Sequence, residues 1–277
     1  MALVNMNEML QKAKNGKYAV ANFDVFNVEM LCGVLNAAQQ KNSPVILAYA
    51  EVFEPLMKLE LFAKMAIACA KDASVPVCLH LDHARGIEFI KKAVDNGFTS
   101  VMIDASDKSF AQNVAATKEV VALCAPKNIS VESELGHVGG LEGYETGYGD
   151  ELTYTQVAEA AEFIKQTGID ALAVSIGTVH GVYKSEPKLN LQRLQELCAA
   201  LSVPLVMHGG SGLSEDDFRN AVKFGITKTN IFTDLTIAAQ NCINHDLLYF
   251  DQCMAIEQAV CDEAIKKLEL FSSVGKA

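Results

Sequence analysis

The segment Val75-Pro76-Val77-Cys78-Leu79-His80-Leu81-Asp82-His83-Ala84 decides how this chain is organised, because an apolar β-type run ends there in an Asp-His pair. Burying such a pair at the end of a strand costs free energy unless the groups are paired or bind a metal. Two later apolar runs end in the same way: Ala171–Ile176 leads to His180, and Val203–Met207 leads to His208. Three histidines that leave three strands in one direction predict a zinc site.

Short β-type runs recur along the whole chain, and most of them are continuously apolar rather than alternating. This pattern is typical of parallel strands that are covered on both faces. The predicted strands are Tyr18–Val25, Pro44–Tyr49, Val75–Asp82, Ser100–Ala105, Ser130–Gly136, Ala171–Ile176, Val203–Gly209 and Ile226–Phe232.

Segments with helical periodicity separate these strands, and a long helical region from about Leu235 to Leu270 ends the chain. Eight alternations of strand and helix predict a (β/α)8 TIM barrel over residues 1–277, as a single domain with a helical C-terminal region. An open doubly wound sheet is the alternative, but the first βα turn lacks the G-x-G-x-x-G motif. The predicted helices are Val28–Gln40, Leu56–Lys71, Gly86–Asn96, Ala111–Ala125, Thr155–Thr167, Leu189–Leu201 and Ser214–Phe224.

Composition limits the classes of partner and compartment. The chain has 277 residues and a net charge of −11, which argues against nucleic acid or a membrane surface as a partner. Its eight cysteines form no C-x-x-C pair and lie mostly in apolar stretches, as expected of reduced thiols in the cytoplasm. The first residues do not resemble a signal peptide, and no apolar run has the ~18 residues of a membrane span. We therefore expect a soluble cytoplasmic protein.

Polar side chains gather where the predicted strands end, which is where barrel enzymes place their active groups. His83, His180 and His208 would leave a fourth zinc position open, as catalytic sites do. Asp104 and Glu134 offer oxygen ligands for a second or alternative metal position.

We expect different roles for four other ionisable residues. Asp82 precedes the first zinc ligand and is the candidate general acid/base. His80 alternates to the same face but lies deeper, as a core residue or a support for the site. His137 and His245 have no partner that the sequence identifies, so we expect surface or structural roles.

Small residues follow the candidate metal ligands and predict a phosphate site. Gly181, and Gly209-Gly210-Ser211, let the backbone approach a ligand and turn N–H groups toward an anion. The block Asn230–Thr233 opens the last helical region, where an anion is favoured, and Lys184 would add a positive charge. The alternative is that these glycines form ordinary turns that bind no ligand, because such turns would show the same spacing. The glycine-rich stretch 137–150 is expected to form a mobile lid.

Zinc, a phosphate site and Asp82 together predict chemistry beside a carbonyl in a phosphorylated small molecule. The metal would act as a Lewis acid that stabilises an enediolate, and Asp82 would move the proton of a hydroxyl during C–C cleavage.

Several motifs resemble those of the class II (metal-dependent) ketose-bisphosphate aldolases. The segment Leu79–Ala84 is similar to the family's H-x-D-H motif. Val131–Gly136, continued by Gly139–Glu142, is similar to E-x-E-L-G-x-x-G-G-x-E. Three further blocks match along the chain, so the resemblance runs from end to end. They are Ala173–Gly181, His208–Gly212 and Asn230–Thr233.

The resemblance implies roles for individual residues. Asp82 would be the general acid/base at the C4 hydroxyl, and Glu142 would handle the C1 proton. Catalytic zinc would be held by His83, His180 and His208, and a second metal position by Asp104 and Glu134. Dihydroxyacetone phosphate would be held by Gly181, Lys184, Gly209, Gly210, Ser211, Asn230, Ile231, Phe232 and Thr233. The family also implies a phosphosugar substrate, a homodimer or homotetramer, and in some members a monovalent cation.

The chain departs from the family at the other end of the substrate. Ala48-Tyr49-Ala50-Glu51 stands where a Q-x-S-x-G-A-like run is usual, and Asp24 replaces an Asn in F-N-V-N-N. The C-terminal region has no Arg for a second phosphate, because the only arginines are Arg85, Arg193 and Arg219. A fructose- or tagatose-type 1,6-bisphosphate is the expectation from the family. A ketose 1-phosphate with an unphosphorylated aldehyde half is the alternative.

Other functions remain open from the sequence. The same three histidines would serve a hydrolase or an epimerase, and a sugar-phosphate sensor would need only the binding loops. A Schiff-base aldolase would need a lysine inside the barrel, for which Lys228 is the best candidate.

Overall fold

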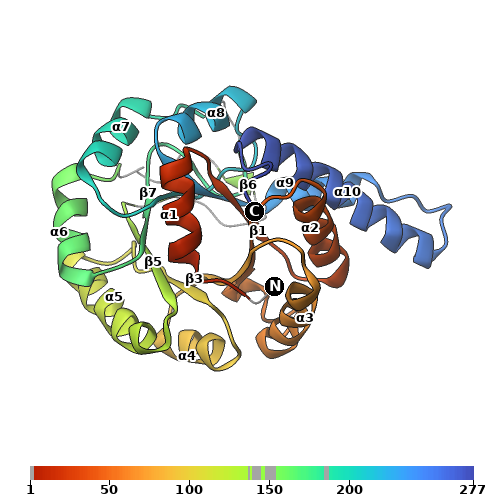
Figure 1. The fold of residues 1–277 in the computed structure, drawn as a ribbon, viewed down its shortest axis with the longest axis horizontal. Helices are drawn as coiled ribbons and strands as arrows, with labels where there is room; N and C mark the ends of the chain where they lie inside the picture. The colour runs from red at the N-terminus through yellow and green to blue at the C-terminus, as the bar shows by residue number, and fades with distance from the viewer. Residues whose placement is uncertain (1–2, 137, 139–144, 147–153, 184–186) are drawn as a thin grey trace.

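A closed barrel of parallel strands forms the centre of the molecule in the computed structural model, which describes residues 3–136, 138, 145–146, 154–183 and 187–277. Around the barrel the order is β1-β10-β9-β7-β5-β4-β3-β2 (Figure 1). The (β/α)8 prediction is confirmed, and the open doubly wound sheet is excluded. The barrel strands are β1 (Val20–Asp24), β2 (Val45–Ala50), β3 (Val77–Ala84), β4 (Ser100–Ile103), β5 (Ser130–Leu135), β7 (Ala171–Val174), β9 (Leu205–Met207) and β10 (Ile226–Ile231).

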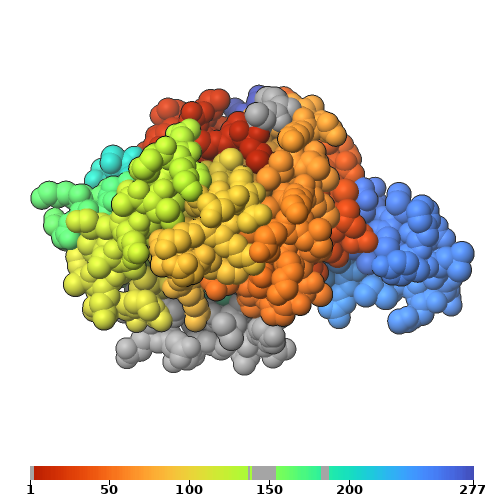
Figure 2. Space-filling view, turned by 90° about the horizontal axis from the view of Figure 1, so that it is seen from below, coloured from red at the N-terminus to blue at the C-terminus, as the bar shows by residue number. Residues whose placement is uncertain are grey.

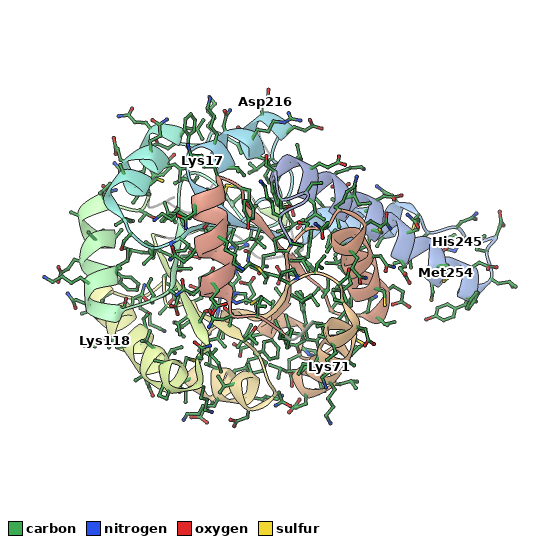
Figure 3. All side chains as sticks on the ribbon, in the orientation of Figure 1. Lys17, Lys71, Lys118, Asp216, His245 and Met254 are labelled. Atoms are coloured by element: carbon green, nitrogen blue, oxygen red, sulfur yellow. The ribbon has the colours of Figure 1, made fainter. Side chains whose placement is uncertain are left out.

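A ring of helices surrounds the barrel and buries the outward-facing side chains of the strands (Figure 1). Ala21 and Phe23 of β1, for example, point outward into this layer and are fully buried. Charged side chains such as Lys118 and Asp216 lie on the outside of the ring (Figure 3). The helices are α2 (Val28–Gln40), α3 (Leu59–Asp72), α4 (Ile87–Asp95), α5 (Phe110–Cys124), α6 (Val157–Thr167), α7 (Leu191–Ala200) and α8 (Glu215–Lys223).

Helix α1 (Met6–Gly16), which we did not predict, closes the bottom of the barrel (Figure 1). Its Met6, Met9, Leu10 and Ala13 are buried against the inward-facing residues of the strands, such as Val20. The apolar positions have the i, i+3, i+4, i+7 spacing of an amphipathic helix. Because this end is packed with apolar side chains, a substrate can enter only from the opposite end.

Additional short elements lie outside the barrel. Strands β6 (Glu145–Thr146) and β8 (Val182–Tyr183) form a two-stranded parallel sheet. The 3-10 helices η1 (Glu51–Phe53) and η2 (Ala125–Lys127) follow β2 and α5. In the part of the chain that the structure describes, no helix is long and apolar enough to cross a membrane.

The C-terminal helical region consists of two helices rather than one, α9 (Thr233–Asn241) and α10 (Tyr249–Leu270). The break is stabilised by the Asn244 side chain, which accepts from the Asp246 N–H at 3.0 Å, and by Gln252, which accepts from the Asn244 N–H at 2.7 Å. The end of α9, the start of α10 and the segment between them form an arm that projects from the barrel and carries His245 and Met254 (Figures 2 and 3). His245 lies exposed on this arm, as expected for a surface residue.

Candidate active site

A bulge at the end of β3 brings two consecutive residues to the mouth of the barrel. Leu81 pairs with Val101, but Ala84 pairs with Ile103, so β3 carries one residue more than β4 over this stretch. His83 adopts a positive φ of 45° there, which is uncommon for a residue with a side chain. A regular strand would turn Asp82 and His83 to opposite faces, whereas the bulge lets both reach the site.

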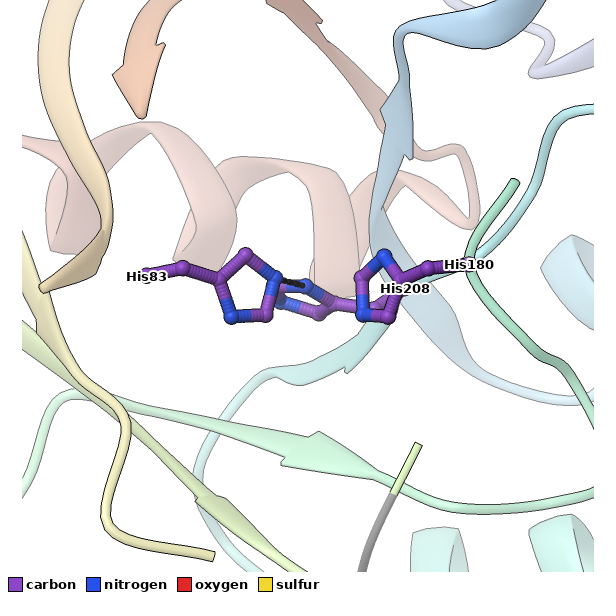
Figure 4. Close-up of side chains that lie close together, drawn as sticks. All are labelled: His83, His180 and His208. Atoms are coloured by element: carbon purple, nitrogen blue, oxygen red, sulfur yellow. Dashed lines mark hydrogen bonds between the residues drawn. The ribbon is translucent and has the colours of Figure 1, made fainter. Parts of the chain in front are cut away.

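Three histidine rings meet above this bulge (Figure 4). The ring centroids of His83 and His180 are 4.7 Å apart, those of His83 and His208 are 4.6 Å apart, and those of His180 and His208 are 5.8 Å apart. One nitrogen from each ring lies within 4.8 Å of the others. The structure thus assembles the predicted metal ligands from β3 and from the loops after β7 and β9.

Carboxylates behind two of these rings determine which nitrogen faces inward. Nδ1 of His83 lies 3.1 Å from Asp104 Oδ2, and Nε2 of His208 lies 2.8 Å from Glu132 Oε1. The remaining nitrogens, His83 Nε2 and His208 Nδ1, lie only 2.8 Å apart. In the metal-free protein a proton on His83 Nε2 bridges to the lone pair of His208 Nδ1. When that proton leaves, both nitrogens offer lone pairs to the same place, so the donor set fits a metal such as zinc.

The rings of His83 and His208 have opposite electrostatic environments. Burial favours the neutral form of His83, but the charges of Asp82, Asp104 and Glu134 outweigh it and raise the pKa well above its usual value. In His208, burial and the neighbouring His83 together lower the pKa to about 4. His208 is therefore the neutral ring at physiological pH, whereas His83 holds a proton that a metal would displace.

Asp82 is fully buried beside the histidines and is held by two neighbours. Its Oδ2 accepts from Asn230 Nδ2 at 2.9 Å, and its Oδ1 lies 3.5 Å from His80 Nε2. Burial alone would raise the pKa of Asp82, but the charge on His83 and the adjacent His80 ring lower it well below its ordinary value. His80 is itself buried, with Nδ1 2.8 Å from Ser100 Oγ, and it lies beneath the histidines on the side of Asp82. The ionised Asp82 can accept a proton from a bound hydroxyl.

Asp104 and Glu134 lie together with His83, and their ligand atoms fall within 4.8 Å of one another. Burial and the charge of Asp104 raise the pKa of Glu134 to about 8. A buried carboxylate and a partly buried one that compete for ionisation in this way are an arrangement that a second cation would relieve.

The loops after β9 and β10 meet at the start of α9. Ser211 Oγ accepts from the N–H groups of Phe232 and Asp234, both at 3.3 Å. Gly209 has a φ of 66°, and a Cβ there would collide with the carbonyl of Val179, so the β7 and β9 loops pack in direct contact. Backbone N–H groups and the positive end of α9 are thus gathered at one side of the mouth, as an anion site requires.

Some of the residues predicted to bind substrate do not turn their side chains toward this anion site. Asn230 turns its side chain toward Asp82, as described above. Ile231 is fully buried in the outer apolar layer, so only its backbone can reach a ligand. Gly181 has a φ of 85° next to the candidate metal ligand His180. Glu142, Lys184 and most of the predicted lid 137–150 lie outside the described residues.

Two residues inside the barrel were not predicted to support the site. Glu132 contacts His208, and Lys228 forms an ion pair with Glu132 at 2.9 Å; both side chains are fully buried. The i, i+2 spacing of Glu132 with Glu134, and of Lys228 with Asn230, was the available signal, because alternate residues of a strand share a face. Lys228 is engaged as an ammonium group beneath the histidines, which argues against a Schiff-base role.

The comparison with known families shows to which family this chain belongs. The family model described as fructose-bisphosphate aldolase class-II matches residues 4–276. The chain belongs to the class II fructose-bisphosphate aldolase family. It is therefore an enzyme of the lyase class, and the class II aldolase resemblance of its motifs is confirmed.

Relatives of this class II aldolase match over nearly their full length. The YdjI protein of Escherichia coli K12 is 44% identical over 270 residues, which cover 96% of each chain. A fructose-bisphosphate aldolase of Staphylococcus aureus is 42% identical over 258 residues, covering 91% of this chain and 90% of the relative. The crystal structure of the YdjI aldolase superposes with a TM-score of 0.92 at 40% identity, covering 99% of both chains.

Proposed function

We propose that this enzyme catalyses the reversible, zinc-dependent aldol cleavage of a ketose phosphate to dihydroxyacetone phosphate and an aldehyde. The observation that carries the proposal is the convergence of His83 Nε2 and His208 Nδ1 beside the buried carboxylate of Asp82. A hydrolase or an epimerase on the same three histidines would not need the loops that meet at the start of α9. A sensor would not need an ionised Asp82 among them.

Zinc would be held by His83, His180 and His208, which supply three nitrogen ligands and leave a position open. When bound, the metal supplies Lewis-acid polarisation of a substrate carbonyl. Asp104 and Glu134 would hold a second divalent metal, and the family resemblance adds a monovalent cation.

The protein's own groups would carry the proton transfers. Asp82 Oδ2 would take the proton of the C4 hydroxyl as the C3–C4 bond breaks, and would return it in the condensation direction. Asn230 and His80 fix the orientation of this carboxylate from two sides. Glu142 is proposed for the C1 proton, on family resemblance alone.

Dihydroxyacetone phosphate would bind at the side formed by the loops after β7, β9 and β10. The Ser211 hydroxyl and the first N–H groups of α9 lie within hydrogen-bonding range of one another and can be shared with a phosphate. The proposed contacts are Gly181, Lys184, Gly209, Gly210, Ser211, Asn230, Ile231, Phe232 and Thr233.

The aldehyde half would lie over β1 to β3, where the family default is a fructose- or tagatose-type 1,6-bisphosphate. One observation favours a ketose 1-phosphate instead: two carboxylates lie on this side, the buried Asp24 and the partly exposed Glu51. Glu51 Oε2 accepts from the N–H of Arg85 at 3.0 Å, so it lies beside the end of β3. Arg193 and Arg219 are engaged on the outer helices α7 and α8, which leaves Arg85 as the one arginine at this rim.

Product release by purified enzyme tests both the metal-dependent cleavage and the choice of substrate. We expect release of dihydroxyacetone phosphate from a ketose 1-phosphate, from a 1,6-bisphosphate, or from both, and loss of release on chelation. If zinc-replete protein releases none from either substrate, the proposed function is wrong. The Arg85→Ala variant separates the substrates, because only a bisphosphate that uses this arginine would show a raised KM.

We also propose that the enzyme is a homo-oligomer, a dimer or a tetramer, in the cytoplasm. Leu248, Tyr249 and Phe250 on the projecting arm are 77%, 83% and 74% exposed, which is unusual for three consecutive large apolar residues. All eight cysteines are free, as in a reducing compartment. Light scattering should give a mass above one chain, and Tyr249→Asp/Phe250→Asp should lower it. A monomeric native enzyme would contradict this proposal.

A further inference from the structure

A buried ion pair lies beneath the three histidines and has no part in the proton transfers proposed above. Lys228 of β10 and Glu132 of β5 face each other across the barrel, and both side chains have no exposed surface. The Lys228 ammonium lies 2.9 Å from Oε2 and 3.1 Å from Oε1 of Glu132. Desolvating two charges commonly costs as much as their attraction returns, so stability alone does not explain such a pair.

The pair makes one contact that points toward the mouth. Glu132 Oε1 lies 2.8 Å from Nε2 of His208, the ring nitrogen opposite to the one that faces His83. An ionised carboxylate can only accept a hydrogen bond, so this contact requires the proton to be on Nε2. Nδ1 of His208 then keeps its lone pair, and that lone pair points to the place where the three rings converge.

We propose that the Lys228–Glu132 ion pair is a positioning device that fixes the orientation and tautomer of His208 for metal binding. Lys228 holds both oxygens of Glu132, which keeps Oε1 directly behind the ring. This inference rests on the proposed metal-binding role of His83, His180 and His208. Lys228 and Glu132 act through His208 and touch neither substrate nor metal.

The alternative reading of the same residues is a second buried metal site. His80, Asp82 and Glu132 do place ligand atoms within 4.8 Å of one another. The ammonium group of Lys228 lies against Glu132, however, and its charge disfavours a cation at that position. The positioning role explains both the ion pair and its contact with His208, whereas the metal site leaves Lys228 unexplained.

The test compares native protein with Glu132→Gln and Lys228→Met. The zinc dissociation constant, measured by competition with a chromophoric chelator, should rise about 10- to 100-fold in Glu132→Gln and about tenfold in Lys228→Met. Long-range 1H–15N correlation on metal-free native protein should show His208 protonated at Nε2, and a mixture of tautomers in Glu132→Gln. The His208 signals can be assigned by their loss in His208→Asn.

A matched control separates positioning from the general effect of breaking a buried ion pair. Lys267 is 7% exposed and pairs with Asp234 and Glu263, away from the histidines. Lys267→Met should lower stability yet change the zinc dissociation constant by less than twofold. If Glu132→Gln and Lys228→Met also stay within twofold, or if Lys267→Met weakens zinc equally, the proposal is wrong.

A double variant covers the case in which a single variant does not fold. Lys228→Met/Glu132→Gln removes both charges, so no uncompensated buried charge remains. We expect it to fold and to change the visible absorption spectrum of bound Co²⁺, because His208 is no longer held. A native Co²⁺ spectrum with native zinc affinity would overturn the proposal. If native protein itself binds no zinc, the proposed function fails first, and the two failures are thereby distinguished.

Discussion

Different chemical groups line the two sides of the barrel mouth. On the side of β7, β9 and β10, glycines and backbone N–H groups gather around Ser211 at the start of α9. On the side of β1 to β4, the mouth carries carboxylates, including Asp24, Glu51 and Asp104. The first side is suited to an anion, and the second to cations and to hydroxyl groups that donate hydrogen bonds.

This difference separates what the enzyme shares with its family from what it does not. The motifs of the β7–β10 side match the class II aldolase pattern, whereas the departures at Asp24 and Glu51 lie on the β1–β4 side. His83 and His208 stand on opposite sides, and their pKa values shift in opposite directions. The chemistry takes place where the two sides meet, at Asp82.

The largest effect on turnover is expected for Asp82, where the two sides meet. Asp82→Asn should lower kcat about 10²- to 10⁴-fold on any substrate, because the amide cannot accept the hydroxyl proton. Zinc content should stay near native, since Asp82 is not a predicted ligand. Asp107→Asn is the matched control, because Asp107 is exposed and should leave kcat unchanged. Retention of full turnover by Asp82→Asn would remove the general base from the account.

The two histidines should give the metal-free protein opposite pH dependences. His208 has a folded pKa of about 4, so the unfolded chain takes up its proton first as the pH falls below 6.5. The free energy of unfolding should therefore fall between pH 6.5 and 4, by up to about 3 kcal/mol. His83 has a raised pKa, so its contribution is complete below pH 6.5 and is lost as the pH rises through the folded value.

Denaturant titrations across this pH range check both signs. His208→Gln should flatten the acid side of the profile, and His83→Gln should flatten the alkaline side. The control His245→Gln, on the exposed arm, should leave both sides as in the native protein. An unchanged acid slope in His208→Gln would show that the ring is not held neutral.

The anion side can be weakened without touching the other side. Ser211→Ala should raise KM about tenfold for every ketose phosphate, because one hydroxyl that orders two backbone N–H groups is lost. Ser214→Ala removes only the N-cap of α8, so it should cost about 1 kcal/mol of stability and leave KM unchanged. An effect of Ser211→Ala on one substrate but not another would contradict a shared phosphate site.

The smallest effect is expected on the carboxylate side. Glu51→Gln should raise kcat/KM for a 1,6-bisphosphate about threefold, because solvent and salt screen this partly exposed charge. The value for a ketose 1-phosphate should change less than twofold. The gain should shrink at high ionic strength. Equal responses of the two substrates would show that Glu51 does not face the aldehyde half.

Much of the fold could be predicted because most of the strands are nearly continuous apolar runs. The barrel, its strand order along the chain and the outer helices follow from that pattern and its turns. Helix α1 was missed because its short amphipathic pattern precedes the first strand and belongs to no βα unit. The break between α9 and α10 depends on hydrogen bonds of Asn244 and Gln252 that no periodicity announces.

The sequence predicted the candidate metal ligands of the site, but not the residues that hold these ligands in place. His83, His180 and His208 follow strand ends, so one rim was expected for all three. The bulge that turns both Asp82 and His83 inward breaks the alternation from which sequence arguments start. Glu132 and Lys228 come from strands far apart in sequence, and only the barrel register brings them together.

Release of dihydroxyacetone phosphate from zinc-replete enzyme is the most direct test of the central claim. It should be followed with fructose 1,6-bisphosphate and a ketose 1-phosphate, before chelation, after chelation and after zinc is restored. We expect release that is lost with the metal and recovered with zinc. The ketose 1-phosphate should be cleaved at least as well as the bisphosphate. Release that is indifferent to chelation would contradict the metal-dependent mechanism, and the absence of release from either substrate would contradict the proposed function.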